Sequence, residues 1–270
     1  MTHTTRAAWA AVLGALVVSA AFAVSAQAAS LPELGRCVSV TRGTGEYAGG
    51  RCIQAVAGTG NHDWLSGPGA EKKFEGSSGE PVILETVGRR QVRCSKPPTY
   101  SGEYTGPKTA TVNLKLTECA DSITGLPCQT LPIMAGTIEA TGLEAELGFI
   151  RQGERPLVGW DLKKSSSLMM FECSKLPNTL VLATVTGSVI GHAGHLNSMT
   201  SEAIVNFKEG RGLQAPENFE GGPQDVLTTK FETGTVTKVV EEEQTGLKAK
   251  FSVANFEALE IRDKCEGATC

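Results

Sequence analysis

Three histidines are the residues whose type and spacing most readily suggest chemistry. His192 and His195 lie three residues apart in a Gly-rich stretch, and His62 precedes Asp63, so these two could add metal ligands from a distant segment. A zinc site needs three or four ligands in a fixed geometry. No third ligand is marked near the His192 and His195 pair. We therefore interpret that stretch as a solvated turn and predict neither a metal site nor a cofactor.

A serine nucleophile would need one of the same histidines as its base. The G-x-S-x-G elbow is absent, and nothing pairs a serine with a histidine and a carboxylate, as this chemistry requires. Ser188 follows Gly187 but lies in an apolar run, so we predict a buried strand position for it. Neither a P-loop nor a dinucleotide-binding glycine motif between strand and helix is present. The sequence therefore predicts no catalytic residue.

Paired carboxylates are another route to catalysis. Glu144 with Glu146, and Glu257 with Glu260, are pairs of the kind that glycoside hydrolases use as acid and nucleophile or base. The chain has 29 acidic residues, however, and carboxylates on strands usually face water. The acidic run 241–243 is interpreted as a solvated turn. A carboxylate pair therefore supports only an alternative hypothesis, a secreted hydrolase of polysaccharide or cell wall.

All eight cysteines lie beyond residue 30 and indicate disulfide bonds. An even number in an exported chain is typical of a disulfide framework, and the chain contains no C-x-x-C motif of redox or zinc proteins. Because eight cysteines allow 105 pairings, we favour the pairs that close the shortest loops. The expected pairs are Cys37–Cys52, Cys119–Cys128, Cys265–Cys270 and, by elimination, Cys94–Cys173.

The N-terminal segment predicts export. Residues 1–6 carry one cation and no acid, residues 7–24 are almost entirely apolar, and residues 25–29 read Ser-Ala-Gln-Ala-Ala, an A-x-A cleavage pattern. We predict a signal peptide over residues 1–28. Its apolar run is short and Ala-rich for a membrane anchor, and we expect no membrane span in the remaining chain. The expected location is the extracellular space or the cell envelope.

Charge and composition narrow the class of partner. The formal net charge is −4, and aromatic residues make up 6% of the chain. Nucleic acids and anionic lipids need a basic footprint, so we expect no nucleic-acid partner. Few aromatic residues are available for a carbohydrate-binding surface. The partner is not readable from the sequence, and a cell-wall or extracellular polymer is one hypothesis.

Apolar and polar residues alternate along several segments, which is the pattern of a half-buried strand. It is clearest over residues 110–117 and recurs over 143–149 and 203–208. Residues 179–190 are rich in β-branched residues and predict a strand buried on both faces. Two hairpins are also expected. The first joins 81–87 to 89–95 at Gly88, and the second spans 230–253 with its turn at 241–246.

These patterns predict an all-β fold, an antiparallel sandwich or flattened barrel of about eight to twelve strands, disulfide-stapled and with little helix. Residues 29–79 are Gly-rich and are predicted to form an N-terminal arm or loop, and residues 80–270 the β-rich domain. A second long loop is expected over 209–225. Long loops in compact domains are uncommon and often functional.

Three phrases, at residues 102–110, 186–191 and 216–222, resemble uncharacterised secreted proteins that certain soil actinobacteria encode in many copies. The first of them reads Gly-Glu-Tyr-Thr-Gly-Pro-Lys-Thr-Ala. The resemblance covers residues 80 to 262. It implies a secreted, β-rich domain, brings no established activity, and transfers no functional residue.

The functional expectation follows from these absences. Because no requirement of a catalytic site is met in the sequence, we expect a secreted, non-enzymatic binding or structural protein of the extracellular space or cell envelope. The alternative remains the secreted hydrolase with a carboxylate pair.

Overall fold

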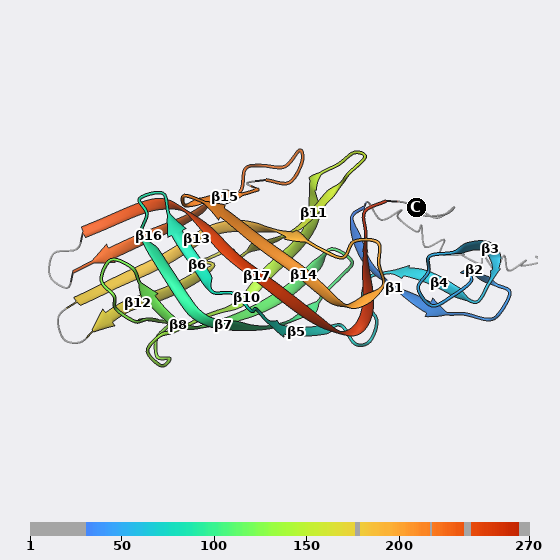
Figure 1. Ribbon diagram of the computed structural model, residues 1–270, viewed down its shortest axis with the longest axis horizontal. Coiled ribbons are helices and arrows are strands. Elements are labelled where there is room, and N and C mark those ends of the chain that lie inside the picture. Colours follow the sequence, from blue (N-terminus) through green and yellow to red (C-terminus); the bar gives the residue numbers. More distant parts are fainter. Residues whose placement is uncertain (1–30, 176–178, 217, 235–238, 265–270) are drawn as a thin grey trace, which may run out of the picture.

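The computed structural model describes residues 31–175, 179–216, 218–234 and 239–264, and every regular element in these ranges is a β-strand (Figure 1). The all-β prediction is confirmed. These ranges contain no helix that could cross a membrane. The predicted signal peptide lies outside the described residues. The strands are β1 (Glu33–Ser39), β2 (Gly45–Tyr47), β3 (Ala55–Gly60), β4 (His62–Ser66), β5 (Lys73–Ser77), β6 (Val82–Thr86), β7 (Gln91–Tyr104), β8 (Thr109–Asp121), β9 (Cys128–Gln129), β10 (Thr137–Arg151), β11 (Leu157–Lys163), β12 (Met169–Lys175), β13 (Thr179–Ala193), β14 (Thr200–Gly210), β15 (Leu213–Ala215), β16 (Leu227–Thr233) and β17 (Val239–Arg262).

The antiparallel strand pairs close on themselves, so the sheet forms a flattened barrel. Strands β7, β8, β13 and β17 are long and take part in both halves of it. In one half β10, β11, β14 and β5 complete the ring between them. In the other half β9, β12, β16 and β6 do so. Within the described residues, the strands of both rings therefore have a partner on each side, which protects their edges.

The alternation predicted for β8 and β10 is confirmed. Leu114 and Leu116 are buried while Asn113 and Lys115 are exposed, and the apolar residues of β10 also face inward. Strand β13 differs from the prediction: buried and half-buried residues alternate over 181–186, and burial is continuous only over 188–191. Apolar side chains from both ends of the barrel join in one core cluster.

One of the two predicted hairpins is confirmed and the turn of the other is wrong. Strands β6 and β7 pair around the predicted turn, with Val82 opposite Cys94. Strands β16 and β17 also pair, but Lys230 lies opposite Glu242, so the acidic run is inside β17 and not in the turn of the hairpin. An exposed strand hydrates glutamates as well as a turn does, so the charge run did not mark a turn.

The segment 29–79, predicted as a Gly-rich arm or loop, contains strands β1–β5 instead. Strands β1–β4 form a small sheet beside the barrel, which we term the N-terminal module, and β5 belongs to the barrel ring. Some of the glycines serve close approach. A Cβ on Gly35 would lie 2.1 Å from Cζ2 of Trp64, and one on Gly60 would lie 2.1 Å from the Tyr47 carbonyl oxygen.

The N-terminal module is fixed to the barrel through the end of β17. Strand β1 pairs with both β4 and β17. The buried guanidinium of Arg262 donates to the Tyr47 hydroxyl at 3.0 Å, to the Cys52 carbonyl at 3.0 Å and to Glu260 at 2.9 Å. It also lies 4.4 Å from the centre of the Trp64 ring. A buried cation that is both paired and hydrogen-bonded is a strong structural constraint.

The six described cysteines form three disulfides, Cys37–Cys52, Cys94–Cys119 and Cys128–Cys173. The first was predicted, whereas the predicted pairs Cys94–Cys173 and Cys119–Cys128 are wrong. Cys94 lies opposite Cys119 on β7 and β8, and Cys128 lies opposite Cys173 on β9 and β12. Strand register, rather than loop length, decides these pairs. The predicted pair Cys265–Cys270 lies outside the described residues.

The second predicted long loop is only partly a loop. Strand β14 continues to Gly210, and β15 follows at Leu213–Ala215. Residues 218–226 form no strand and connect β15 to β16 along the outside of the barrel (Figure 1).

Candidate functional site

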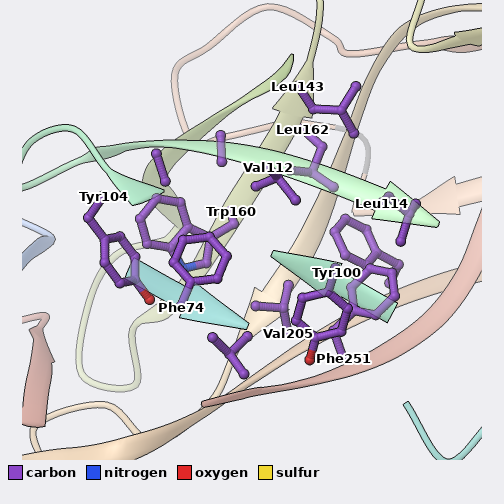
Figure 2. Close-up of a pocket in the computed structure, with 14 residues that line it drawn as sticks. Phe74, Tyr100, Tyr104, Val112, Leu114, Leu143, Trp160, Leu162, Val205 and Phe251 are labelled. Carbon is purple, nitrogen blue, oxygen red and sulfur yellow. The ribbon is translucent and has the colours of Figure 1, made fainter. Parts of the chain in front are cut away.

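One half of the barrel encloses an apolar cavity of about 60 Å³ (Figure 2). It lies where β5, β10, β11 and β14 complete the ring, and we refer to this as the cavity half. In the other half the corresponding space between the buried side chains is only about 10 Å³, and we refer to that as the packed half. Protein interiors are normally close-packed, so the cavity distinguishes one half as a candidate site.

Aromatic rings form much of the cavity lining. The ring centres of Phe74 and Tyr104 are 4.7 Å apart, those of Tyr104 and Trp160 are 6.1 Å apart, and those of Tyr100 and Phe251 are 4.9 Å apart. Figure 2 shows two groups of rings at the two ends of the cavity, with aliphatic side chains between them. Tilted ring pairs of this kind are mutually stabilising.

Glycines on the neighbouring strand make room for two of these rings. Phe74 lies directly opposite Gly102, and Tyr100 directly opposite Gly76. A Cβ on Gly102 would lie 2.2 Å from Cζ of Phe74, and one on Gly76 would lie 2.4 Å from the Tyr100 hydroxyl. The rings therefore lean over the backbone of the wall instead of filling the centre of the barrel, and this arrangement leaves the cavity open.

The two tyrosine hydroxyls of the lining already have partners. The Tyr104 hydroxyl donates to Oδ1 of Asn255 at 2.9 Å, and the Tyr100 hydroxyl lies 3.5 Å from the Ser77 carbonyl oxygen. Burial raises the pKa of both tyrosines, so both are neutral at physiological pH. Among the described residues, no charged side chain lines the cavity. The site is therefore suited to apolar molecules.

A second, smaller space of about 30 Å³ adjoins the cavity towards the N-terminal module. The two spaces share Tyr104, Trp160, Val205 and Val253 as lining residues, so these side chains separate them. His195, Thr200 and Asn255 also line the smaller space, which makes it more polar.

The histidine prediction needs one correction. His192 lies in β13 opposite Asn206, not in a turn, and burial together with Lys208 lowers its pKa. His195 is in the turn that follows, with a φ of 59°. Within the part of the chain that the structure describes, no three histidine, cysteine or acidic side chains are grouped so that they could hold a metal ion.

His62 has partners that the sequence did not reveal. Its Nε2 lies 3.1 Å from the Ser39 hydroxyl, and its Nδ1 lies 2.7 Å from Oδ1 of Asn61. Ser39 lies opposite His62 in the pairing of β1 with β4, and it is exposed. The group resembles a Ser-His-Asn arrangement, but the third member is a neutral amide. It cannot stabilise an imidazolium as a carboxylate would.

The predicted carboxylate pairs are not arranged to face each other across a cleft. Glu144 and Glu146 lie on the outer face of β10, where Glu146 forms an ion pair with Lys163. Glu257 accepts a hydrogen bond from the Gly69 amide, and the buried Glu260 pairs with Arg262. Each of the last three carboxylates thus has a structural partner.

The carboxyl group with the most perturbed environment is Asp161, which sequence analysis missed. It is 4% exposed, and its Oδ1 has no hydrogen-bond partner in the described structure. Burial, followed by the charge of Asp225, raises its pKa to about 7. Ser188, buried as predicted, hydrogen-bonds this carboxyl group. A single acid in an apolar strand gives no sequence signal for this, because the covering chain is distant in sequence.

Comparison with known proteins identifies no relative. No protein-family model, no curated protein and no solved structure matches the chain.

Proposed function

We propose that the protein is a secreted, non-enzymatic binding protein of the extracellular space or cell envelope, and that the barrel interior holds a small apolar molecule. The observation that carries this proposal is the cavity of about 60 Å³ whose lining is apolar and rich in aromatic rings. The predicted signal peptide and the disulfides are compatible with an exported protein.

The chemistry of the lining defines the ligand class. An apolar cavity stays free of water and gains free energy when apolar atoms enter it. The tyrosine hydroxyls are occupied and none of the described lining residues is charged, so a charged or strongly polar ligand would lose hydration without compensation. Uncharged hydrocarbon or aromatic molecules meet these conditions.

The size of the cavity adds a mechanical requirement. An engineered cavity of about 150 Å³ holds benzene, whereas this one is about 60 Å³. A ligand of that size must move side chains. Tyr104 and Trp160 are suited to this movement because the smaller space of about 30 Å³ lies directly behind them.

Thermal unfolding in the presence of benzene tests the proposal. Because a ligand that binds only the folded state raises its stability, the unfolding midpoint should rise in benzene-saturated buffer. Ala145→Leu fills the cavity from β10 and should abolish the rise. Thr111→Leu, at an exposed position on the outer face of β8, is the matched control and should retain it. An unchanged midpoint for the native protein would refute binding in the barrel.

A sedimentation assay tests the location half of the proposal. The oxidised protein is mixed with purified cell walls of its own host, and the protein left in solution is measured across salt concentrations. Depletion that persists at moderate salt supports an envelope-associated role. Full recovery in the supernatant would leave only the released, extracellular form.

A further inference from the structure

The chain between β15 and β16 covers the outer face of the cavity wall. We refer to its residues 218–226 as the strap. Its Glu220 amide donates to the Phe149 carbonyl at 2.8 Å. The ring of Phe219 lies over Gly148, where a Cβ would be 2.7 Å from the ring. At the end of the strap, the Val226 carbonyl oxygen lies 1.8 Å from where a Cβ on Gly187 would be. The strap therefore packs closely on β10 and β13.

Asp161 is on β11, which lies between β10 and β13 in the sheet, so the strap crosses this strand on its way from β10 to β13. Its neighbours in β11, Trp160 and Leu162, line the cavity, so by alternation Asp161 points to the outer face. That face would normally be solvated, yet Asp161 is buried and its Oδ1 has no partner in the described residues. A buried ionised carboxylate with an unsatisfied oxygen is costly, whereas a protonated carboxyl group is not.

The charges around Asp161 come from each element packed against it. The strap contributes Asp225, β10 contributes Glu146, and β11 contributes Lys163, whose Nζ lies 3.8 Å from Oδ2 of Asp161. Strand β13 contributes the uncharged hydroxyl of Ser188. The two carboxylates oppose ionisation of Asp161. Lys163 favours it, but this lysine is also engaged by Glu146.

Ionisation therefore acts on the strap. While Asp161 carries a proton, the strap can cover it without burying an unpaired charge. When the proton is lost, repulsion from Asp225 and the need for hydration both favour movement of the strap away from β11. The pKa of Asp161, raised by burial and by Asp225 to about 7, places this change near neutral pH.

We propose that the strap is a proton-controlled cover of the cavity wall, closed over protonated Asp161 and loosened when Asp161 ionises. Strand β10 carries the strap on one face and the cavity-lining residues Leu143 and Ala145 on the other. Loosening the strap therefore removes the outer support of the wall and lowers the affinity for the apolar ligand. This second consequence rests on the function proposed above.

Hydrogen exchange of the strap tests the proposal without any ligand. Exchange is followed by mass spectrometry on strap peptides of the oxidised protein, from about pH 5 to about pH 9, with correction for the intrinsic pH dependence of exchange. Protection of residues 218–226 should fall as pH rises through about 7. Peptides from the packed half, such as those of β12, should show no such step.

Three variants test which carboxyl group causes the pH-dependent fall in protection. Asp161→Asn mimics the protonated acid and should keep the strap protected across the range. Asp225→Asn removes a like charge and should move the fall in protection to lower pH. Glu75→Gln, an exposed carboxyl on β5, is the control and should follow the native protein. A native strap with pH-independent protection, or a step that persists in Asp161→Asn, would overturn the proposal.

The ligand consequence is tested separately with benzene. Its dissociation constant should increase between about pH 6 and about pH 8 in the native protein and stay constant in Asp161→Asn. Binding that ignores pH in both proteins would overturn the link between strap and cavity. If benzene does not bind at any pH, the proposed function fails, while the exchange experiment still decides whether the strap responds to protons.

Discussion

The cavity half and the packed half share four long strands but differ in what fills their interiors. In the packed half, mainly aliphatic side chains and the ring of Phe171 surround a remaining space of about 10 Å³, whereas aromatic rings line the space of about 60 Å³ in the cavity half. Two disulfides, Cys94–Cys119 and Cys128–Cys173, lie in the packed half. One half is thus built for rigidity, and the other tolerates a void that a ligand can use.

Two buried aspartates show the same difference in their surroundings. Asp121 in the packed half receives two hydrogen bonds from Arg90, at 3.0 and 3.1 Å, and that guanidinium stacks on Phe231. Asp161, on the wall of the cavity half, has an unsatisfied oxygen and a carboxylate neighbour. A satisfied buried charge holds a structure in one arrangement, and an unsatisfied one makes it respond to pH.

Truncation of a phenylalanine should distinguish the halves most strongly. Phe171→Ala removes a fully enclosed ring from the packed half and should cost about 3–5 kcal/mol of unfolding free energy. Phe74→Ala should cost less than about 3 kcal/mol, because one side of that ring already faces a void. Urea unfolding of both variants measures the costs. Equal losses would contradict the difference in packing.

Removal of a disulfide should weaken the packed half next. Cys128 and Cys173 are separated by 45 residues, so replacing both by alanine should cost about 4 kcal/mol through the freer unfolded chain. Native-state hydrogen exchange should show loss of amide protection first in β9 and β12, and later in β5 and β14. Loss that starts in the cavity half would show that the two halves do not open separately.

A fall in pH should change the contributions of Asp121 and Asp161 to folding stability in opposite directions. Burial raises the pKa of Asp121, but the hydrogen bonds and charge of Arg90, with Thr124, outweigh this and hold it below its usual value. Its stabilisation is therefore present above about pH 4 and is lost as pH falls further. The pKa of Asp161 is raised from 3.8 to about 7. Its contribution to folding stability is therefore fully present below about pH 4, where the carboxyl group is protonated in both the folded and the unfolded chain. That contribution, at most about 4 kcal/mol, declines as pH rises towards 7.

Asparagine variants separate the two effects. Stability measured by urea unfolding across pH should decline less between about pH 4 and about pH 7 in Asp161→Asn than in the native protein. Asp121→Asn should be less stable at neutral pH, because it leaves the Arg90 charge buried without its partner. The same slope for Asp161→Asn and the native protein would show that this carboxyl group ionises normally.

The fold was more predictable from the sequence than the site. Alternation over 110–117 fixes which face of β8 is buried, because a half-buried strand has period two. The many glycines of residues 29–79 led to the wrong prediction of a loop. In the structure Gly35 and Gly60 lie within strands, where the missing side chain leaves room for a tryptophan ring and for a neighbouring backbone, respectively. The acidic run 241–243 misled because glutamate is solvated in a strand and a turn alike.

The site depends on contacts that no local pattern records. Phe74 and Gly102 are 28 positions apart, and only the register of β5 with β7 brings them together to shape the cavity. The disulfide pairs were mistaken for the same reason, since Cys94 meets Cys119 through the pairing of β7 with β8. Burial and then the charge of Asp225, a residue of the strap, raise the pKa of Asp161. Register and chain crossing are properties of the closed barrel and not of any segment.

The smallest expected effect comes from adding methyl groups to a buried alanine, which should stabilise the cavity half and destabilise the packed half. Ala145 on β10 lines the cavity, so Ala145→Val adds methyl groups to empty space and should stabilise the protein by about 1 kcal/mol. Ala183 on β13 is fully buried between Phe171 and Phe231 of the neighbouring strands, so Ala183→Val should destabilise by about 1–3 kcal/mol through overpacking. Urea unfolding under identical conditions measures both. Destabilisation by Ala145→Val as well would mean that the aromatic lining cannot yield to an added group, and a wall that cannot yield to two methyl groups could not admit a ligand the size of benzene.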